Sequence, residues 1–336
     1  VMPDQPIARA LQALAGGLGL GEQLTAEAFG QLMRGEATAA QAAGLLMGLR
    51  MRGETPDEVT GAARALREAM IRVPLTSADH VIDTCGTGGG TVSTFNVSTA
   101  AALVVVGAGG KVAKHGNRSY TSKCGSADVI EALGVALPPD AESAARVLAS
   151  AGMVFLFAPA YHPAMRFVAP VRRELGVATI MNVIGPLANP AGVRRQVVGV
   201  ADRSRGPILA EALRRLDAEH ALVVHAQVGM DEISPSGTTD VWEVRDGEVR
   251  TWSIDPTRYG IDPGDLAALA GGEASANAAR VTRLLDDPEA DSVGRATVLL
   301  NAAAGLYVGG LARDLNEGLE RGSAALRSGA AAEALE

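Results

Sequence analysis

A glycine-rich segment that leads into hydroxyl side chains is the first candidate for chemistry. Residues 86–99 read GTGGGTVSTFNVST and follow a short apolar segment, 81–82, that is typical of a buried strand. Glycines after a strand let backbone N–H groups approach a phosphate. Asn96, Ser98 and Thr99 stand where a helix is expected to begin, and the free N–H groups there favour an anion. The segment matches neither the Walker pattern nor the dinucleotide fingerprint. A structural turn is the alternative, and the hydroxyls favour a phosphate site.

The second candidate is the run KHGNRS at residues 114–119, with hydroxyls following at Ser122 and Ser126. We expect a polar loop from 114 to 125, just past a strand at 111–113. Such donors suit a phosphorylated sugar or a carboxylate. A lone His115 is more often structural and a lone basic loop is usually solvated, but the position at a strand end favours a function.

Two adjacent carboxylates form the third candidate. Asp231 and Glu232 follow an expected strand and Gly229. Carboxylate oxygens are ligands that Mg²⁺ accepts while it keeps several waters. For an isolated Asp-Glu pair, an exposed acidic turn is the more frequent structure.

The fourth candidate runs from His162 through Arg172 and Arg173 to the proline-rich stretch 182–190. Either arginine could hold a carboxylate with two parallel hydrogen bonds. From these residues alone, solvated arginines on a helix are favoured. The prolines indicate an irregular segment.

The elements that must position these residues are helical at first and then mixed. One apolar helix face is expected at Ile7, Leu11, Leu14 and Leu18, a second helix spans 39–49, and a third begins at Thr55. From residue 78 onward, short apolar strands alternate with helices, and Asp246-Gly247 joins two strands as a hairpin. This order predicts an α/β fold, with a mostly parallel central sheet flanked by helices and with ligands at the strand carboxyl ends. We expect a small all-helical domain at 1–75, joined by a helical segment near 165–195, and a larger α/β domain at 76–336.

Composition limits the class of protein. The 336 residues include 30 Lys and Arg against 38 Asp and Glu, which gives a formal net charge of −8 and argues against a nucleic-acid binder held by bulk charge. The two cysteines cannot form a disulfide framework, and no apolar run is long enough for a membrane span. No signal peptide is visible. We therefore expect a cytoplasmic protein.

The motifs together resemble the anthranilate phosphoribosyltransferase family. The resemblance rests on GTGG and TFNVST, on KVAKHGNRS, on SKCGSADVIEALGV, and on YHPAM, VRRELG, NVIGPLANP and GMDEISP, in the family's order. It implies a nucleoside-phosphorylase-like fold, a homodimer, and transfer of the phosphoribosyl group of phosphoribosyl pyrophosphate (PRPP) to the amine of anthranilate, the second step of tryptophan biosynthesis from chorismate. It also implies Mg²⁺, with two ions.

The resemblance assigns roles to individual residues. It implies Mg²⁺ ligation by Ser98, Asp231 and Glu232. It implies anthranilate contacts by Gly86, His115, Asn117 and Arg172, and electrostatic catalysis by Lys114 and Arg172 with no general base. The positions implied to bind PRPP are Gly86, Gly89, Gly90, Thr94, Asn96, Val97, Ser98, Thr99, Lys114, His115, Gly116, Asn117, Ser122 and Ser126.

Three positions depart from the family pattern. Gly90 stands where an Asp is common, Ala178 where many members have Arg, and Met181 where many have Phe. We expect these departures to weaken PRPP binding or to change its dependence on Mg²⁺. Two other functions stay open: a same-fold transferase or phosphorylase with another aromatic or nucleobase acceptor, and a non-catalytic nucleic-acid-binding paralogue. The net charge and the Asp231-Glu232 pair disfavour the paralogue.

Overall fold

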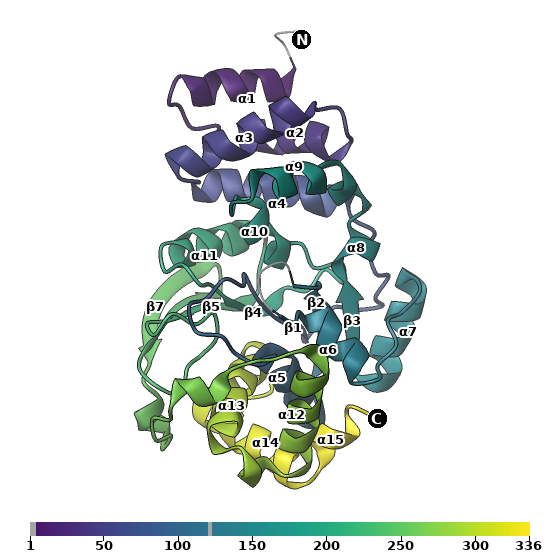
Figure 1. The fold of residues 1–336 in the computed structure, drawn as a ribbon, viewed down its shortest axis with the longest axis vertical. Helices are drawn as coiled ribbons and strands as arrows, with labels where there is room; N and C mark the ends of the chain where they lie inside the picture. The colour runs from purple at the N-terminus through teal and green to yellow at the C-terminus, as the bar shows by residue number, and fades with distance from the viewer. Residues whose placement is uncertain (1–4, 120–122) are drawn as a thin grey trace.

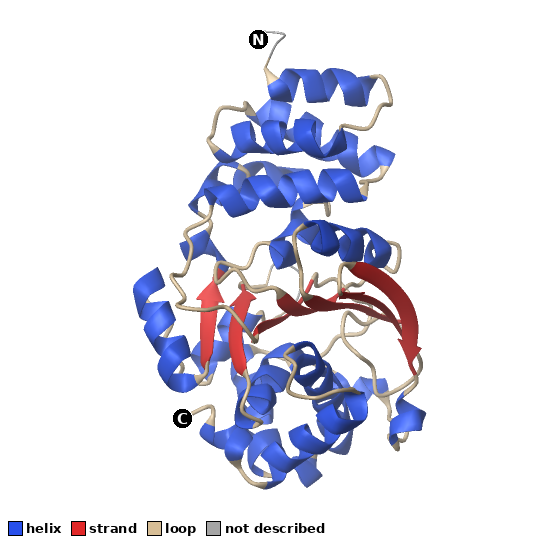
Figure 2. Ribbon diagram, turned by 180° about the vertical axis from the view of Figure 1, so that it is seen from behind, coloured by secondary structure: helices blue, strands red, loops and turns tan. Residues whose placement is uncertain are grey.

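The molecule is built in three layers, seen edge-on in Figures 1 and 2. The computed structural model describes residues 5–119 and 123–336. A group of helices lies at the top of both views, a twisted sheet crosses the middle, and a second group of helices, near the C-terminus, covers the other face of the sheet. The fold is therefore α/β, with helices on both faces of the sheet, as the alternation of elements predicted.

The upper layer, called here the helical unit, contains four N-terminal helices and one from the middle of the chain. They are α1 (Pro6–Ala15), α2 (Gly21–Met33), α3 (Ala39–Arg52), α4 (Pro56–Ala69) and α9 (Ala169–Leu175). The predicted start of α4 is confirmed: Thr55 and Glu58 form a reciprocal capping box. The prediction that the first helix extends to Leu18 is wrong. The helix ends at Ala15, Gly17 adopts a left-handed φ of 74°, and Leu18 is 64% exposed.

Seven strands form one mostly parallel sheet in the order β3-β2-β1-β4-β5-β6-β7. The strands are β1 (Val81–Gly86), β2 (Lys111–Gly116), β3 (Met153–Phe157), β4 (Arg195–Gly199), β5 (His220–Ala226), β6 (Thr239–Arg245) and β7 (Glu248–Ile254). The five strands β1 to β5 are parallel, and β6 and β7 add antiparallel neighbours at one edge. The predicted hairpin at Asp246-Gly247 is confirmed, and both residues have positive φ, at 55° and 76°.

The prediction that a polar loop starts at residue 114 is wrong. Strand β2 continues to Gly116, so that Lys114 and His115 are strand residues with exposures of 1% and 9%. Pairing with β3 extends through Gly116 and Phe157, which supplies the backbone partners that a loop would lack. The two side chains are consequently fixed by the sheet.

Two large apolar cores lie on opposite faces of the sheet, and a smaller third core lies where α7 packs on β3. On the lower face, α5 (Val97–Gly107) and α13 (Ser292–Val308) pack on the strands, with α12 (Ala274–Asp286), α14 (Leu315–Arg327) and α15 (Ala330–Glu333) around them. On the upper face, α10 (Met181–Ile184) and α11 (Arg205–Arg215) share a continuous core with the helical unit. The other helices of the described residues are α6 (Ser126–Ala132), α7 (Ala141–Ala151) and α8 (Ala158–Tyr161), with short 3₁₀ turns that include η1 (Pro163–Phe167) and η2 (Gly185–Leu187).

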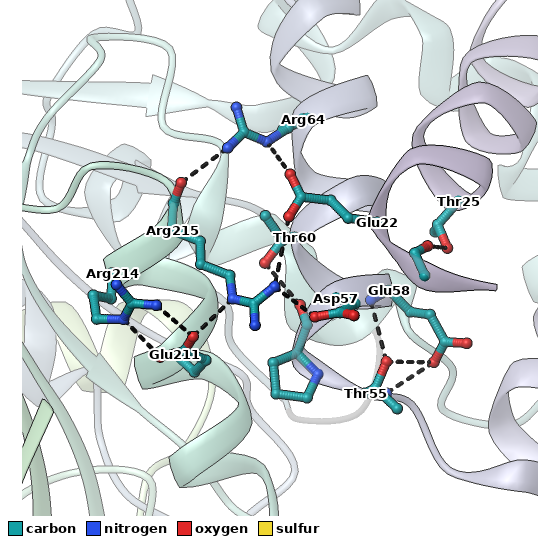
Figure 3. Close-up of polar contacts among 12 residues, drawn as sticks. Glu22, Thr25, Thr55, Asp57, Glu58, Thr60, Arg64, Glu211, Arg214 and Arg215 are labelled. Atoms are coloured by element: carbon teal, nitrogen blue, oxygen red, sulfur yellow. Dashed lines mark hydrogen bonds and ion pairs between the residues drawn. The ribbon is translucent and has the colours of Figure 1, made fainter. Parts of the chain in front are cut away.

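Ion pairs also tie the helical unit to α11, as Figure 3 shows. Arg215 contacts Asp57 of α4 at 2.5 Å and Glu211 of its own helix at 2.7 Å. Arg64 of α4 binds Glu22 at 2.7 Å and donates to the backbone oxygen of Arg215 at 3.0 Å. The helical unit is therefore docked on the sheet layer by both apolar packing and charge. Within the described ranges, no helix is long and apolar enough to cross a membrane.

Candidate functional site

A large cleft lies where the carboxyl ends of β1, β2 and β4 approach the helical unit. Its volume is about 1690 Å³, and its walls combine the loops that follow these strands with residues of α4, α9 and α10. In an open parallel sheet, this edge is where ligands bind. The sheet side supplies glycines, hydroxyls and carboxylates, whereas the helical side supplies Arg172 and apolar groups such as Leu66.

The glycine-rich loop begins where β1 ends and is pinned to the acidic pair. Gly88 and Gly89 adopt left-handed φ values of 68° and 84°, which favour glycine. The Gly88 N–H donates to Asp231 Oδ2 at 2.8 Å. A Cβ on Gly86 would lie 2.5 Å from that same oxygen, so the carboxylate can sit here only because residue 86 is glycine.

The acidic pair is partly buried in the cleft rather than an exposed turn. Glu232 Oε1 accepts a hydrogen bond from Thr94 Oγ1 at 3.0 Å, while its Oε2 is buried with no partner among the described residues. Burial, and then the charge of Asp231, raises the pKa of Glu232 to about 8, and burial raises that of Asp231. A buried, unsatisfied carboxylate beside a second one is the arrangement that a bound cation relieves.

These donors fit Mg²⁺. Asp231, Glu232 and the Ser98 hydroxyl all line the cleft and offer oxygen ligands only. Among residues 5–119 and 123–336, no group of three His, Cys, Asp or Glu side chains gathers to enclose a metal. Two carboxylates and a hydroxyl leave room for water and substrate oxygens, which is how Mg²⁺ is commonly held.

Lys114 places a buried ammonium beside the start of α5. Its Nζ donates to the backbone oxygen of Thr84 and to Ser98 Oγ, the latter at 3.1 Å. Burial lowers the pKa of Lys114, while the carboxylates of Asp83 and Glu232 act in the opposite direction. The ammonium is therefore fixed at the position where a phosphate bound by the glycine-rich loop would need a counter-charge.

Two histidines face each other across the cleft floor. His115 Nε2 and His162 Nε2 are 3.2 Å apart, so only one of them can carry a proton on that atom. Burial lowers the pKa of His115 to about 3 and that of His162 to about 4. Both rings are neutral at pH 7, and because their planes are tilted by 51° the pair offers an uncharged, angled aromatic surface to the cleft.

The two arginines of α9 differ in where they lie. Arg172 is partly buried and lines the cleft together with Met181, Asn182 and Pro186, whereas Arg173 lies outside its walls. The cleft therefore has two sides. Its helical side could hold an aromatic carboxylate, and its sheet side could hold phosphates.

The structure brings most of the predicted site residues together, and of those in the described ranges it leaves one out of the cleft lining. Thr99, in the first turn of α5, is fully buried and does not line the cleft. Ser122 lies outside the described residues. The predicted residues that line the cleft are Gly86, Gly89, Gly90, Thr94, Asn96, Val97, Ser98, Lys114, His115, Gly116, Asn117, Ser126, Arg172, Asp231 and Glu232.

Two asparagines of the cleft were not predicted. Asn277 of α12 donates to Asn96 Oδ1 at 3.0 Å, and Asn301 of α13 accepts from the Ile233 N–H at 3.0 Å and donates to its oxygen at 2.9 Å. Asn301 thus holds the loop just after the acidic pair. The sequence feature that could have indicated Asn301 is its position as a single polar residue in the apolar run LLNAAAGL.

Gly90 is enclosed by the loop that carries the acidic pair. A Cβ at this position would lie 2.8 Å from the backbone oxygen of Gly229 and 3.5 Å from Asp231 Oδ1. Because the same Gly229 oxygen accepts the Thr91 N–H at 2.9 Å, any larger residue at position 90 requires the loop to shift. Asp231 therefore occupies the space beside Gly90.

Comparisons with known proteins agree with this geometry. The model of the glycosyl transferase family helical bundle domain matches residues 8–70, and that of the glycosyl transferase family a/b domain matches residues 78–332. The anthranilate phosphoribosyltransferase of Thioalkalivibrio sulfidiphilus is 48% identical over 98% of this chain and 96% of its own.

Solved structures give the same family. The anthranilate phosphoribosyltransferase of Thermus thermophilus is similar with a TM-score of 0.91 and 42% identity, covering 97% of both chains. The enzyme of Saccharomyces cerevisiae, in complex with PRPP and Mg, is similar with a TM-score of 0.90 and 25% identity, covering 99% of this chain and 96% of its own. A second structure of the yeast enzyme contains 4-fluoroanthranilate. By the extent and identity of these matches, the chain belongs to the anthranilate phosphoribosyltransferase family.

Proposed function

We propose that this chain transfers the phosphoribosyl group of PRPP to the amine of anthranilate, giving N-(5-phosphoribosyl)anthranilate and pyrophosphate, the second step of tryptophan biosynthesis from chorismate. The observation that carries the proposal is that one cleft holds a phosphate-type donor set on the sheet side and Arg172 on the helical side. Family membership supports the same reaction.

PRPP would lie along the sheet side of the cleft. The N–H groups of the glycine-rich loop and of the start of α5 would hold its phosphates, with Lys114 as a fixed counter-charge. Ser98, Asp231 and Glu232 would hold Mg²⁺ through oxygen ligands. We propose two ions, the number that the family resemblance implies. Bound there, Mg²⁺ would neutralise charge on the pyrophosphate.

The reaction needs positioning and charge more than acid–base chemistry. The bond from the ribose anomeric carbon to the pyrophosphate oxygen breaks, and its electron pair leaves with pyrophosphate. The lone pair of the neutral anthranilate amine forms the new C–N bond, and the ammonium that results loses its proton to solvent. Lys114 stabilises the leaving group electrostatically, and Arg172 aligns the amine by holding the anthranilate carboxylate.

The acceptor would lie between Arg172 and the two histidines. The neutral His115 ring and the Asn117 side chain both line the cleft, and Gly86 lies at the junction of the two halves. A positive charge opposite uncharged aromatic rings favours an aromatic carboxylate over a nucleobase. A different aromatic acceptor on the same fold remains the second candidate, and an acceptor panel distinguishes the two.

We further propose a cytoplasmic homodimer. Apolar Met51 on α3 and Leu18 beyond α1 are 79% and 64% exposed, and α1 packs against α3, which suits contact with a second copy through the helical unit. We propose that this unit is a domain of residues 1–75 that is completed by the segment near 165–195, because both belong to one apolar core. Sedimentation velocity tests whether the protein is a dimer. The variant Met51→Glu should shift the equilibrium from dimer toward monomer.

Product analysis tests the reaction itself. Purified protein with PRPP, anthranilate and Mg²⁺ should form phosphoribosylanthranilate, measured by mass, and an equal amount of pyrophosphate. Replacing anthranilate by benzoate, which has the carboxylate but no amine, should give no product. The variant Asp231→Asn should lose Mg²⁺-dependent PRPP binding in calorimetry. Pyrophosphate release without a ribosylated anthranilate would contradict the proposed acceptor.

A further inference from the structure

We propose that Arg67 and Gln196 are positioning residues for the acceptor, because they hold the backbone of the turn that walls its side of the cleft. The inference rests on the proposed function and adds two residues that do not touch either substrate. It concerns residues 185–188, Gly-Pro-Leu-Ala, called here the wall turn.

The wall turn is short and has little internal support. Its one internal backbone hydrogen bond among the described contacts runs from the Ala188 N–H to the Gly185 oxygen, at 3.1 Å. Gly185 and Pro186 face the cleft, while Leu187 and Ala188 are fully buried. A turn of this kind takes its position from whatever holds its other carbonyl groups.

Side chains of two different elements hold the two middle carbonyls. Gln196 of β4, 2% exposed, donates from Nε2 to the Pro186 oxygen at 2.9 Å. Arg67 of α4 donates from Nε to the Leu187 oxygen at 2.6 Å and from Nη1 to the Leu216 oxygen at the end of α11, at 3.2 Å. Arg67 therefore connects the helical unit, the wall turn and α11 through one guanidinium.

The ends of the wall turn are held from the sheet side. The backbone of Gly185 forms a hydrogen bond with the His115 side chain, whose Nε2 lies 3.2 Å from His162 Nε2. The next residue, Asn189, donates from Nδ2 to Asp83 and to the Ala113 oxygen, both at 2.8 Å. The two histidines of the cleft floor and the wall turn are thus parts of one bonded assembly.

Arg67 is suited to this role at neutral pH. Burial lowers its pKa to about 10, so that the guanidinium stays charged and its hydrogen bonds to carbonyls stay charge-assisted. Removing it leaves the buried Leu187 oxygen without a described partner and lets the turn shift. Because a displacement of about 1 Å at a reacting group can reduce the rate by about a hundredfold, a small shift of the wall turn should weaken the alignment of the acceptor.

Arg64 provides a matched control. It lies one turn earlier on the same helix, it is also an arginine, and it also donates to a backbone oxygen of α11, that of Arg215, at 3.0 Å. It is exposed, pairs with Glu22 and contacts neither the wall turn nor the cleft lining. Substituting it removes a comparable interdomain contact and leaves the wall turn intact.

The test compares steady-state kinetics of the wild type, Arg67→Gln, Gln196→Leu and Arg64→Gln with both substrates varied. We expect KM for anthranilate to rise about tenfold in Arg67→Gln and Gln196→Leu, with KM for PRPP within about twofold of the wild type. Arg64→Gln should stay within about twofold for both. In Arg67→Lys, which can reach one carbonyl, KM for anthranilate should be intermediate, and this variant replaces Arg67→Gln if the latter does not fold.

A purely structural role would lower Tm in Arg67→Gln and Arg64→Gln alike without separating the two KM values. Equal KM values for anthranilate in these two variants, or an equal rise in both KM values, would overturn the inference. Failure of the wild type and Arg64→Gln to turn over anthranilate would instead overturn the proposed function, so the two failures are distinguishable.

Discussion

The Gly88 N–H donates a 2.8 Å hydrogen bond to the Asp231 carboxylate, although 143 residues separate them in the chain. The contact joins the loop after β1 to the loop after β5, and it brings the N–H groups of the glycine-rich loop and the acidic pair to one point of the cleft. The glycine-rich loop, which we propose binds phosphate, is therefore shaped by the same carboxylate that would hold Mg²⁺. Loss of the carboxylate should consequently affect phosphate binding as well as metal binding.

Lys114→Met should reduce kcat/KM for PRPP by about a hundredfold to a thousandfold, because it removes a buried ammonium from the leaving-group side of the cleft. Lys111→Met is the matched control, since Lys111 lies on the same strand with an exposed side chain. It should leave the rate within about twofold. Similar losses in both variants would show that strand stability rather than charge at the cleft explains the effect.

The two cleft histidines should lower the free energy of unfolding as the pH falls from about 6.5 to 4, whereas Glu232, whose folded pKa is raised to about 8, contributes in the opposite direction above its unfolded pKa. The unfolded chain binds protons at both cleft histidines near the usual His pKa, whereas the folded pKa values are about 3 for His115 and about 4 for His162. A histidine whose pKa is lower in the folded state stabilises the fold at a pH above its unfolded pKa. This stabilisation is lost on acidification, and the free energy of unfolding then falls by up to about 1.4 kcal/mol per pH unit for each histidine.

His162→Asn should remove the contribution of this histidine, measured as the difference from the wild type in the pH dependence of urea unfolding. An unchanged slope in His162→Asn would contradict burial as the cause of the lowered pKa.

Arg205→Ala should destabilise the fold by about 3–5 kcal/mol, because its partner Glu54 has a side chain only 1% exposed and would remain buried without a counter-charge. Arg214→Ala breaks a solvent-exposed pair with Glu211 on the same helix and should cost at most about 1 kcal/mol. Equilibrium denaturation of both variants measures the difference. Comparable values for the two would mean that Glu54 gains solvent when Arg205 is removed.

Many of the helices and strands could be predicted from the sequence, but the positions of individual side chains could not. The apolar runs and the capping residues determine the elements locally, which is why the start of α4 and the hairpin at Asp246-Gly247 were predictable. The extent of β2 was not, because Lys114 and His115 are polar and enter the strand only through pairing with β3. Tertiary contacts here override local preference.

The site shows the same division. The residue types of the glycine-rich loop and the acidic pair indicated their chemistry. The residue types alone could not choose between Arg172 and Arg173; the family resemblance pointed to Arg172, and the packing of α9 brings that arginine to the cleft. Asn301 lies 68 residues from the Ile233 backbone that it holds, so no local pattern could connect them. Arg67 and Gln196 are likewise defined by long-range contacts.

The most direct test of the account is the loss of anthranilate fluorescence with PRPP and Mg²⁺, measured in the wild type, Arg172→Ala and Arg173→Ala. We predict rapid Mg²⁺-dependent loss in the wild type and in Arg173→Ala, and a KM for anthranilate at least about tenfold higher in Arg172→Ala, because only Arg172 of the two lines the cleft. No loss in the wild type, or equal KM values in the two variants, would contradict the account.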